Sequence, residues 1–176
     1  VLHDFFTTGK YSPRTADKTY VTSSPSMDIS KASNFERFVY LLAEKNGEKI
    51  HTLWQDVNAG KGFDISDLMA DINGKYGFAS GKSTHADRIA TIKQVYAEDN
   101  QLIDPHTADG IKVAREVRKE GEVIVCAETA LPAKFAETIT EAVGQLDIPR
   151  PKHTDNIESL AQYVTVLDND ANLVLS

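Results

Sequence analysis

Most of the chain carries apolar residues three or four positions apart, which is the spacing of amphipathic α-helices. The first residues, 1–6, also read as an amphipathic segment. The sequence therefore predicts a chain built mainly from helices. The clearest segments with this spacing are residues 35–42, 50–57, 65–72, 84–96, 104–119 and 132–143.

Residues that cap helices flank most of these segments. Thr84 and Asp87 form a capping box, in which a hydroxyl and a carboxylate bond each other's backbone N–H groups. Ser33 and Glu36 have the same spacing, and Asp64 is a candidate N-cap of the segment that follows it. Other signals of helix ends are Asp104 before Pro105, Gly60, Gly121 and Gly144.

One segment breaks the helical period. Residues 123–127, Val-Ile-Val-Cys-Ala, form a continuous apolar run, which is typical of a strand buried on both faces of a parallel sheet. Residues 19–24 and 77–80 are two further strand candidates. A strand between two helices indicates the α/β class. A sheet of two or three strands is too small to be covered by this many helices, so we expect that part of the sheet is missing. The start at Val1 agrees with this, because it resembles the start of an excised or processed piece.

The composition of the C-terminal end differs from that of the rest. Two prolines, Pro149 and Pro151, interrupt residues 147–153 and indicate a linker. A short helix is predicted from about Ile157, and a last apolar piece covers residues 163–167. We therefore expect residues 1–145 to form one unit and residues 146–176 to form a linker and tail.

Charge and cysteine content narrow the function classes. The chain has 176 residues, with 19 Lys and Arg against 26 Asp and Glu and a formal net charge of −7. This acidic balance argues against a nucleic-acid partner and against a polybasic membrane anchor. The sequence shows no signal-peptide pattern and no apolar run near the ~20 residues that cross a bilayer. A single cysteine, Cys126, fits a reducing compartment, so we expect a cytoplasmic protein with this thiol buried and inert.

Two clusters of polar residues lie at predicted helix starts and suit an anion. Ser83 and Thr84 follow Gly81 and Lys82, where free N–H groups and the helix dipole favour negative charge. A nucleotide-binding P-loop is disfavoured, because the position of its first glycine holds Tyr76. The alternative is a plain capping turn with a solvated lysine.

The second cluster consists of Ser33, Asn34 and Arg37, which offer hydroxyl, amide and guanidinium donors to a phosphate. Ser33 is also explained by the predicted cap. Thr129 follows the predicted strand at its carboxyl end, where open α/β sheets bind their ligands. It is therefore a candidate ligand contact.

Nothing in the sequence favours a metal centre. The spacings His-x-x-x-His and Cys-x-x-Cys are absent, and His85 and His106 are better explained as structural histidines. Asp64, Asp67 and Asp71 follow one helix face and read as solvated surface.

Several motifs, in their order and spacing, resemble the C-terminal part of the threonine synthase family, in its longer bacterial and fungal branch. The resemblance runs from about residue 1 to residue 145. The motifs that carry it are Ser24-Pro25-Ser26-Met27-Asp28-Ile29, Ser33-Asn34-Phe35-Glu36-Arg37, Ser83-Thr84-His85-Ala86-Asp87-Arg88, Asp104-Pro105-His106-Thr107-Ala108 with Gly110, and Thr129 with Pro132-Ala133-Lys134-Phe135.

The resemblance implies a pyridoxal-phosphate enzyme of fold type II, similar to the tryptophan synthase β-subunit. Such an enzyme converts O-phospho-L-homoserine and water to L-threonine and phosphate. Its cofactor lysine lies in a Ser-Phe-Lys-Asp segment, and a glycine-rich loop binds the cofactor phosphate. Neither feature is in this chain, and Lys134 is not such a lysine. The resemblance thus implies a missing N-terminal half, no catalytic residue here, and a fragment that is inactive alone.

The resemblance also suggests site residues. Thr129 matches the late-strand hydroxyl that hydrogen-bonds the pyridine nitrogen of pyridoxal phosphate. The clusters Ser33-Asn34-Arg37 and Ser83-Thr84 resemble places where substrate phosphate could bind.

Two other functions stay open at this point. One is a related pyridoxal-phosphate lyase, such as a threonine or serine dehydratase. The other is an anion-binding or assembly module without catalysis, which the lack of a nucleophile–base pair favours. A homo-oligomer is possible in each case, because surface made for a missing half drives association.

Overall fold

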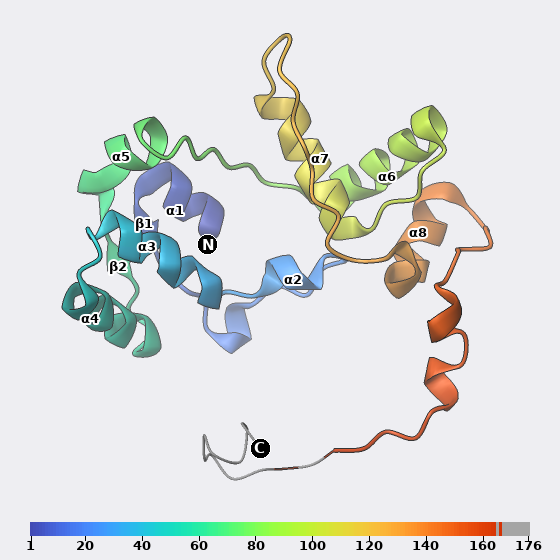
Figure 1. Cartoon of the computed structure of the whole chain (residues 1–176), viewed down its shortest axis with the longest axis horizontal. Coiled ribbons are helices and arrows are strands. Elements are labelled where there is room, and N and C mark those ends of the chain that lie inside the picture. Colours follow the sequence, from blue (N-terminus) through green and yellow to red (C-terminus); the bar gives the residue numbers. More distant parts are fainter. Residues whose placement is uncertain (165, 167–176) are drawn as a thin grey trace.

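The computed structural model describes residues 1–164 and 166, and these residues fold mainly into helices (Figure 1). Two groups of elements follow each other along the chain. The first group is α1 (Leu2–Thr8), β1 (Lys10–Tyr11), η1 (Ala16–Lys18), α2 (Pro25–Asp28), η2 (Ser33–Phe35), α3 (Glu36–Leu42), α4 (Gly47–Asn58), β2 (Phe63–Asp64), η3 (Ser66–Leu68) and α5 (Met69–Gly74). The second is α6 (His85–Asp99), α7 (Pro105–Val117), η4 (Pro132–Phe135), α8 (Ala136–Val143), η5 (Lys152–Thr154) and η6 (Ile157–Ser159).

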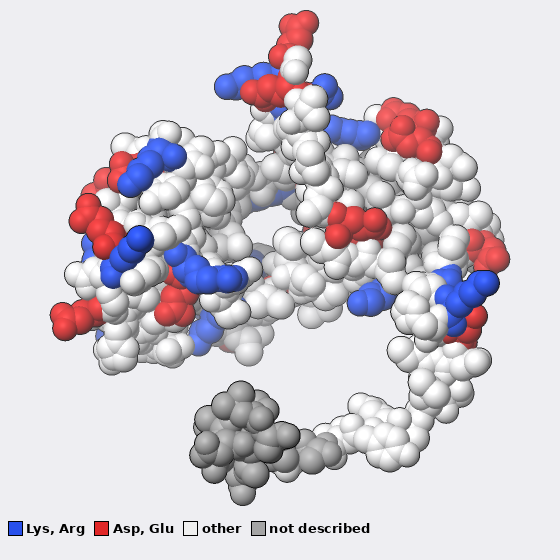
Figure 2. Space-filling model, in the orientation of Figure 1, with Lys and Arg blue, Asp and Glu red and all other residues white. Residues whose placement is uncertain are grey.

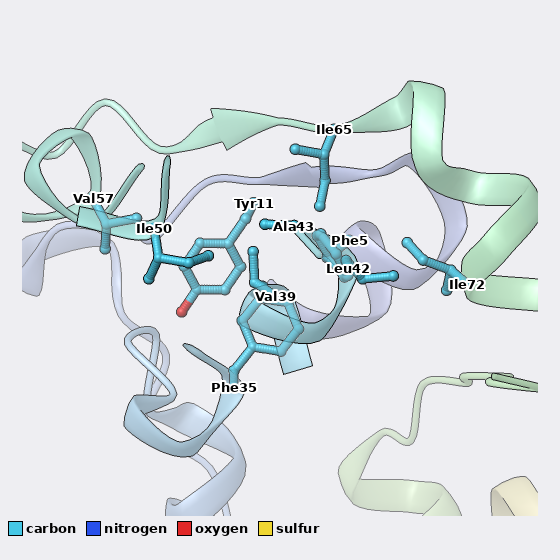
Figure 3. Close-up of a cluster of buried hydrophobic side chains, with 10 residues drawn as sticks. All are labelled: Phe5, Tyr11, Phe35, Val39, Leu42, Ala43, Ile50, Val57, Ile65 and Ile72. Atoms are coloured by element: carbon cyan, nitrogen blue, oxygen red, sulfur yellow. The ribbon is translucent and has the colours of Figure 1, made fainter. Parts of the chain in front are cut away.

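The first group packs around aromatic side chains (Figure 3). Phe5 is fully buried and meets Phe35 edge to face, with ring centroids 4.6 Å apart. Tyr11 is also buried, and its hydroxyl donates to the Ser30 carbonyl at 3.0 Å while it accepts from the Ala32 N–H at 3.1 Å. This burial raises the pKa of Tyr11. The core thus fixes the chain between Ser30 and Phe35, just before α3.

A short antiparallel ribbon holds the two ends of this first group together. In it β1 pairs with β2, with Tyr11 opposite Phe63. Gly62 comes directly before β2 and has a φ of +72°, and a Cβ there would overlap the carbonyl oxygen of Tyr11. Glycine is therefore required where the two strands approach each other.

The second group has its own core, in which α6 packs against both α7 and α8. Ile92, Ala108 and Ile139 come from these three helices and are all fully buried. Figure 2 shows an opening between the two groups of elements. A polar contact joins them directly where the Ser26 N–H of α2 lies 3.1 Å from His106 Nε2 of α7. The segment between α5 and α6 also contacts α1, with His3 Nδ1 3.1 Å from Ser80 Oγ and Lys82 3.6 Å from Asp4.

The predicted helices are confirmed in most details. Thr84 and Asp87 form both bonds of the predicted capping box at α6, and the Asp104 side chain caps α7. The capping box predicted at Ser33 and Glu36 is wrong. Ser33 begins the 3₁₀ turn η2 and Glu36 begins α3, and neither element has a side-chain cap. A 3₁₀ turn bonds its N–H groups to carbonyls three residues back, which replaces the side-chain acceptor.

Asp64 lies in β2 rather than at a helix start. Its carboxylate accepts from the Ser66 N–H at 2.9 Å, and α5 begins only at Met69. Asp64 therefore shapes the turn that leads to α5, a role that short acidic side chains often have.

All three predicted strands are absent from the described residues. Residues 123–127 run as an extended chain between α7 and η4, and Val123 and Val125 are each 89% exposed. Cys126 is half-buried, so the prediction of a buried thiol is also wrong. Residues 19–24 and 77–80 likewise make no strand. A strand needs a neighbour to receive its backbone hydrogen bonds, and the only strand pair among the described residues is β1 with β2.

Among the residues after α8 that the structure describes, the chain carries two short 3₁₀ turns, η5 and η6, so the helix predicted from Ile157 is a single turn. The apolar piece predicted at residues 163–167 falls partly outside the described residues. Among the described residues, no helix has the length and apolar character needed to cross a membrane.

Candidate functional site

A buried arginine connects four segments of the chain. Arg88 lies on the core side of α6, one turn before Ile92, and is 5% exposed. Its Nε donates to Asp109 Oδ1 of α7 at 2.8 Å, and its Nη1 donates to Ser23 Oγ at 3.1 Å. Its Nη2 donates to the carbonyl oxygen of Ser83 at 3.3 Å. One guanidinium therefore ties α6 to α7 and to the segments that hold Ser23 and Ser83.

Arg88 also lines a pocket of about 400 Å³, which we name the Arg88 pocket. The Ser83 hydroxyl oxygen is buried and makes no hydrogen bond within the described residues. Two distant segments, residues 21–23 and the start of α6, form the walls. The lining residues are Val21, Thr22, Ser23, Ser83, Thr84, His85 and Arg88.

A chain of hydrogen bonds crosses one side of the Arg88 pocket. Ser23 Oγ lies 2.8 Å from His85 Nδ1, and His85 Nε2 lies 2.9 Å from Glu141 Oε1 of α8. Glu141 can only accept when it is ionised, so His85 Nε2 carries a proton. In the neutral imidazole Nδ1 is then an acceptor, and the Ser23 hydroxyl donates to it.

A second histidine fixes the segment that carries Ser23. His106 is buried at the start of α7, and its Nε2 accepts from the Ser26 backbone N–H at 3.1 Å. Its Nδ1 therefore donates, and it lies 2.9 Å from Asp104 Oδ1. Asp104 is fully buried and also accepts from the His106 backbone N–H at 2.9 Å and from the Thr107 hydroxyl. The bond to Asp104 thus keeps the proton of His106 on Nδ1 and leaves Nε2 free to accept from the Ser26 N–H.

The first group of elements contains another pocket, of about 420 Å³, which we name the Arg37 pocket. Ser33, Asn34 and Arg37 lie together there, as their sequence spacing predicts. Glu36 and Tyr40 of α3 and Ile50 of α4 complete the lining. The carboxylate of Glu36 gives this pocket an acidic group beside its one arginine.

The predicted site residues therefore fall into three places. Ser33, Asn34 and Arg37 line one pocket, and Ser83 and Thr84 line the other. Thr129 lines neither pocket. It is exposed in the extended segment between α7 and η4.

Sequence reasoning missed the central arginine. Arg88, Thr91, Ile92 and Val95 are all buried on one face of α6, so a charged residue occupies a core position. An arginine within an apolar stripe signals a buried ion pair, because an unpaired buried charge is very costly. Its partner Asp109 could not be identified in this way, because the two residues lie on different helices.

The capping box beside the Arg88 pocket is the clearest electrostatic feature of its rim. Hydrogen bonds from the Thr84 side chain and backbone N–H lower the pKa of the Asp87 carboxyl below its ordinary value of 3.8. Within the described residues, no group of three or more His, Cys, Asp or Glu side chains could hold a metal ion.

Comparisons with known proteins agree on one family. The family profile described as "Threonine synthase, C-terminal" matches residues 107–176. Threonine synthases of Methylobacillus glycogenes and Corynebacterium glutamicum are 49% and 46% identical to the chain, each over 99% of it. The chain spans 37% of the length of each of these curated relatives.

A solved structure gives the same result. The crystal structure of a "PLP bound Threonine synthase from Brucella melitensis" matches with a TM-score of 0.77 and 33% identity, covering 98% of this chain and 36% of that one. The predicted fold class, a helix-rich α/β portion with an incomplete sheet, is thereby confirmed. The chain belongs to the threonine synthase family and corresponds to its C-terminal part.

Proposed function

We propose that this chain is the C-terminal part of a pyridoxal-phosphate-dependent lyase, a threonine synthase, which acts in the cytoplasm in threonine biosynthesis. The parent enzyme converts O-phospho-L-homoserine and water to L-threonine and phosphate. The observation that carries the proposal is similarity over nearly the whole chain, at 49% identity to the threonine synthase of Methylobacillus glycogenes. The chain alone is expected to be inactive, because the lysine that holds the cofactor belongs to the N-terminal part.

The residue proposed to meet the cofactor is Thr129. The Brucella melitensis relative is described as bound to PLP, and the hydroxyl chemistry of Thr129 fits a pyridine ring, since an O–H donates to an unprotonated ring nitrogen. Thr129 is exposed in this chain. This exposure fits the proposal, because a residue that contacts a cofactor held by another part of the enzyme must lie at the surface. When bound, the cofactor supplies an electron sink for the carbon atom that carries the amino group.

Substrate binding is assigned to the two polar clusters. Ser33, Asn34 and Arg37 in the Arg37 pocket, and Ser83 and Thr84 in the Arg88 pocket, offer donors to the anionic substrate. These side chains would bind and orient O-phospho-L-homoserine. Phosphate oxygens accept hydrogen bonds from hydroxyl, amide and guanidinium groups alike.

The N-terminal part of the enzyme is the proposed partner of residues 123–127. Val123 and Val125 are each 89% exposed, which is unusual for valine and suits a strand whose neighbour lies in that part. In this proposal residues 1–145 belong to the catalytic region, and residues 146–176 form a linker and tail. Without the N-terminal part, the same surface would favour a homo-oligomer of the chain.

A genetic test uses a chimera. The portion of the Methylobacillus glycogenes enzyme that this chain does not cover is fused to the chain and expressed in a threonine auxotroph that lacks threonine synthase. The proposal predicts growth without threonine for the chimera and none for either portion alone. Failure of a well-folded chimera to support growth, or growth with this chain alone, would contradict it.

A further inference from the structure

The two pockets differ in the charges that line them. The Arg37 pocket includes the carboxylate of Glu36, which repels an anion and competes with it for Arg37. None of the described residues that line the Arg88 pocket is acidic. The carboxylates of Asp28, Asp87 and Glu141 are hydrogen-bonded to the lining residues Thr22, Thr84 and His85, and none of the three is bonded to Arg88. Arg88 is hydrogen-bonded to one carboxylate, that of Asp109. This bond joins Arg88 Nε to Asp109 Oδ1 at 2.8 Å. Of the two pockets, the Arg88 pocket is therefore the better environment for an anion.

The Arg88 pocket also holds donors that the chain itself does not use. A guanidinium has five N–H groups, and the Arg88 side chain makes three hydrogen bonds, so two N–H groups remain. The Ser83 hydroxyl is buried without a partner, which costs free energy unless a bound group accepts from it. A buried arginine and an unpartnered buried hydroxyl in one pocket point to an oxygen-rich ligand.

The Ser23 hydroxyl is the third donor, and its availability depends on His85. While His85 is neutral, Ser23 donates to Nδ1 and accepts from Arg88, so it has no proton to offer. When His85 gains a proton, both ring nitrogens donate, Nδ1 to Ser23 and Nε2 to Glu141. The Ser23 hydroxyl proton then turns away from His85 and can point into the pocket.

We propose that the Arg88 pocket binds a tetrahedral oxyanion of the phosphate-ester class, with Arg88, Ser83 and Ser23 as its ligands and His85 as a positioning residue that takes up a proton on binding. In the parent enzyme the ligand would be the phosphate group of the substrate, and this identification rests on the proposed function. Ser23, His85 and Arg88 extend the set of substrate contacts beyond Ser83 and Thr84.

The charged groups around His85 support proton uptake. Glu141 of α8 contacts its ring, and Asp87 of α6 lies two residues away with a carboxyl held ionised by Thr84. The positive charge of Arg88, which contacts Ser23, is offset by Asp109 of α7. An incoming dianion adds negative charge to this surrounding and favours the imidazolium form.

The test measures the affinity of the full chain for sulfate by isothermal titration calorimetry at pH 5.5 and pH 8.0. Sulfate has the shape of phosphate and stays a dianion over this range, so any pH dependence comes from the protein. Uptake of one proton per bound ion allows up to about a tenfold loss of affinity for each unit of rising pH. We expect sulfate binding at least about tenfold weaker at pH 8.0.

Matched variants identify the residues involved. His85→Gln should abolish the pH dependence, whereas His51→Gln, at an exposed histidine of α4, should leave it unchanged. Ser83→Ala should weaken binding severalfold at both pH values with an unchanged circular dichroism spectrum. Lys75→Gln, at an exposed lysine just after α5 and outside both pockets, should have no effect.

Several results would overturn the inference: no sulfate binding to the folded chain, an equal pH dependence in His85→Gln, or an affinity that Ser83→Ala leaves unchanged. O-Phospho-L-homoserine, inorganic phosphate and L-homoserine separate the possible ligands. Tighter binding of the ester than of phosphate identifies an ester site, and equal affinities identify a site for free phosphate. Binding of L-homoserine as tight as that of its ester would also contradict an oxyanion site. An inactive chimera would refute the proposed function and leave the sulfate result standing.

Discussion

The buried ion pair between Arg88 and Asp109 should contribute strongly to the stability of the second group of helices. Its side chains are only 6% and 12% exposed, and Nε and Oδ1 lie 2.8 Å apart. Asp109→Ala leaves a buried guanidinium without its counter-charge, which costs about 3–5 kcal/mol in comparable pairs. The structure thus predicts a loss of roughly 4 kcal/mol in the free energy of unfolding.

Urea unfolding followed by far-ultraviolet circular dichroism measures this loss. With a denaturant dependence of about 2 kcal/mol per molar urea, the unfolding midpoint should fall by roughly 2 M. The control is Glu116→Ala, which removes the exposed ion pair with Lys112 and should change the midpoint little. The double variant Arg88→Met, Asp109→Leu should recover part of the stability, since an apolar pair removes the uncompensated charge but not the lost bonds to Ser23 and Ser83. A midpoint shift below about 0.5 M for Asp109→Ala would refute the reasoning.

Three further predictions follow from single features of the structure. Because hydrogen bonds from Thr84 lower the Asp87 pKa, the capping box should stabilise α6 above pH 3.8 and lose its effect as pH falls through the lowered pKa. Carboxyl NMR titration should show a lowered pKa that Thr84→Val, which removes the hydroxyl but keeps the backbone N–H bond, moves part of the way back toward 3.8. In the chimeric enzyme, Thr129→Val should lower turnover by roughly one to two decades, because it leaves the pyridine nitrogen of the cofactor without its hydrogen-bond donor. The melting temperature should change little. Unchanged turnover with a lowered melting temperature would show that Thr129 does not contact the cofactor. The exposed valines of residues 123–127 should make the isolated chain associate, and Val123→Lys with Val125→Lys should reduce the mass seen by light scattering at high concentration, whereas a wild-type monomer would count against this.

The sequence predicts best those elements whose signals are local. The helix α6 follows from the spacing of Ile89, Ile92 and Tyr96 together with the capping box of Thr84 and Asp87, all within 13 residues of one another. The same holds for α7 with Asp104. Helix caps and apolar periodicity depend on residues within one or two turns, so they predict a helix without knowledge of the rest of the fold.

Elements that depend on distant partners are harder to predict. Residues 123–127 have the composition of a buried strand, yet they stay unpaired and exposed because no neighbouring strand lies within the described residues. The ribbon of β1 and β2 has two residues in each strand, too short for a period of two to show. A strand forms only when a second strand pairs with it, so the sequence of one segment cannot predict it alone.

The candidate site divides in the same way. Ser83 and Thr84 stand out as a helix start, and Ser33, Asn34 and Arg37 as a cluster, because their members are close in sequence. The bonds of Ser23 to His85 and Arg88 span 62 and 65 residues, so no spacing rule reveals them. Only the folded chain shows that Ser23 belongs beside Ser83.

If this chain completes a threonine synthase when it is joined to an N-terminal part, the purified chimera should form both products of the reaction. Phosphate and L-threonine are quantified after incubation with O-phospho-L-homoserine and pyridoxal phosphate. We expect equal amounts of the two products from the chimera and neither product from this chain alone. Formation of 2-oxobutanoate and ammonia in place of threonine, or turnover by the chain alone, would contradict it.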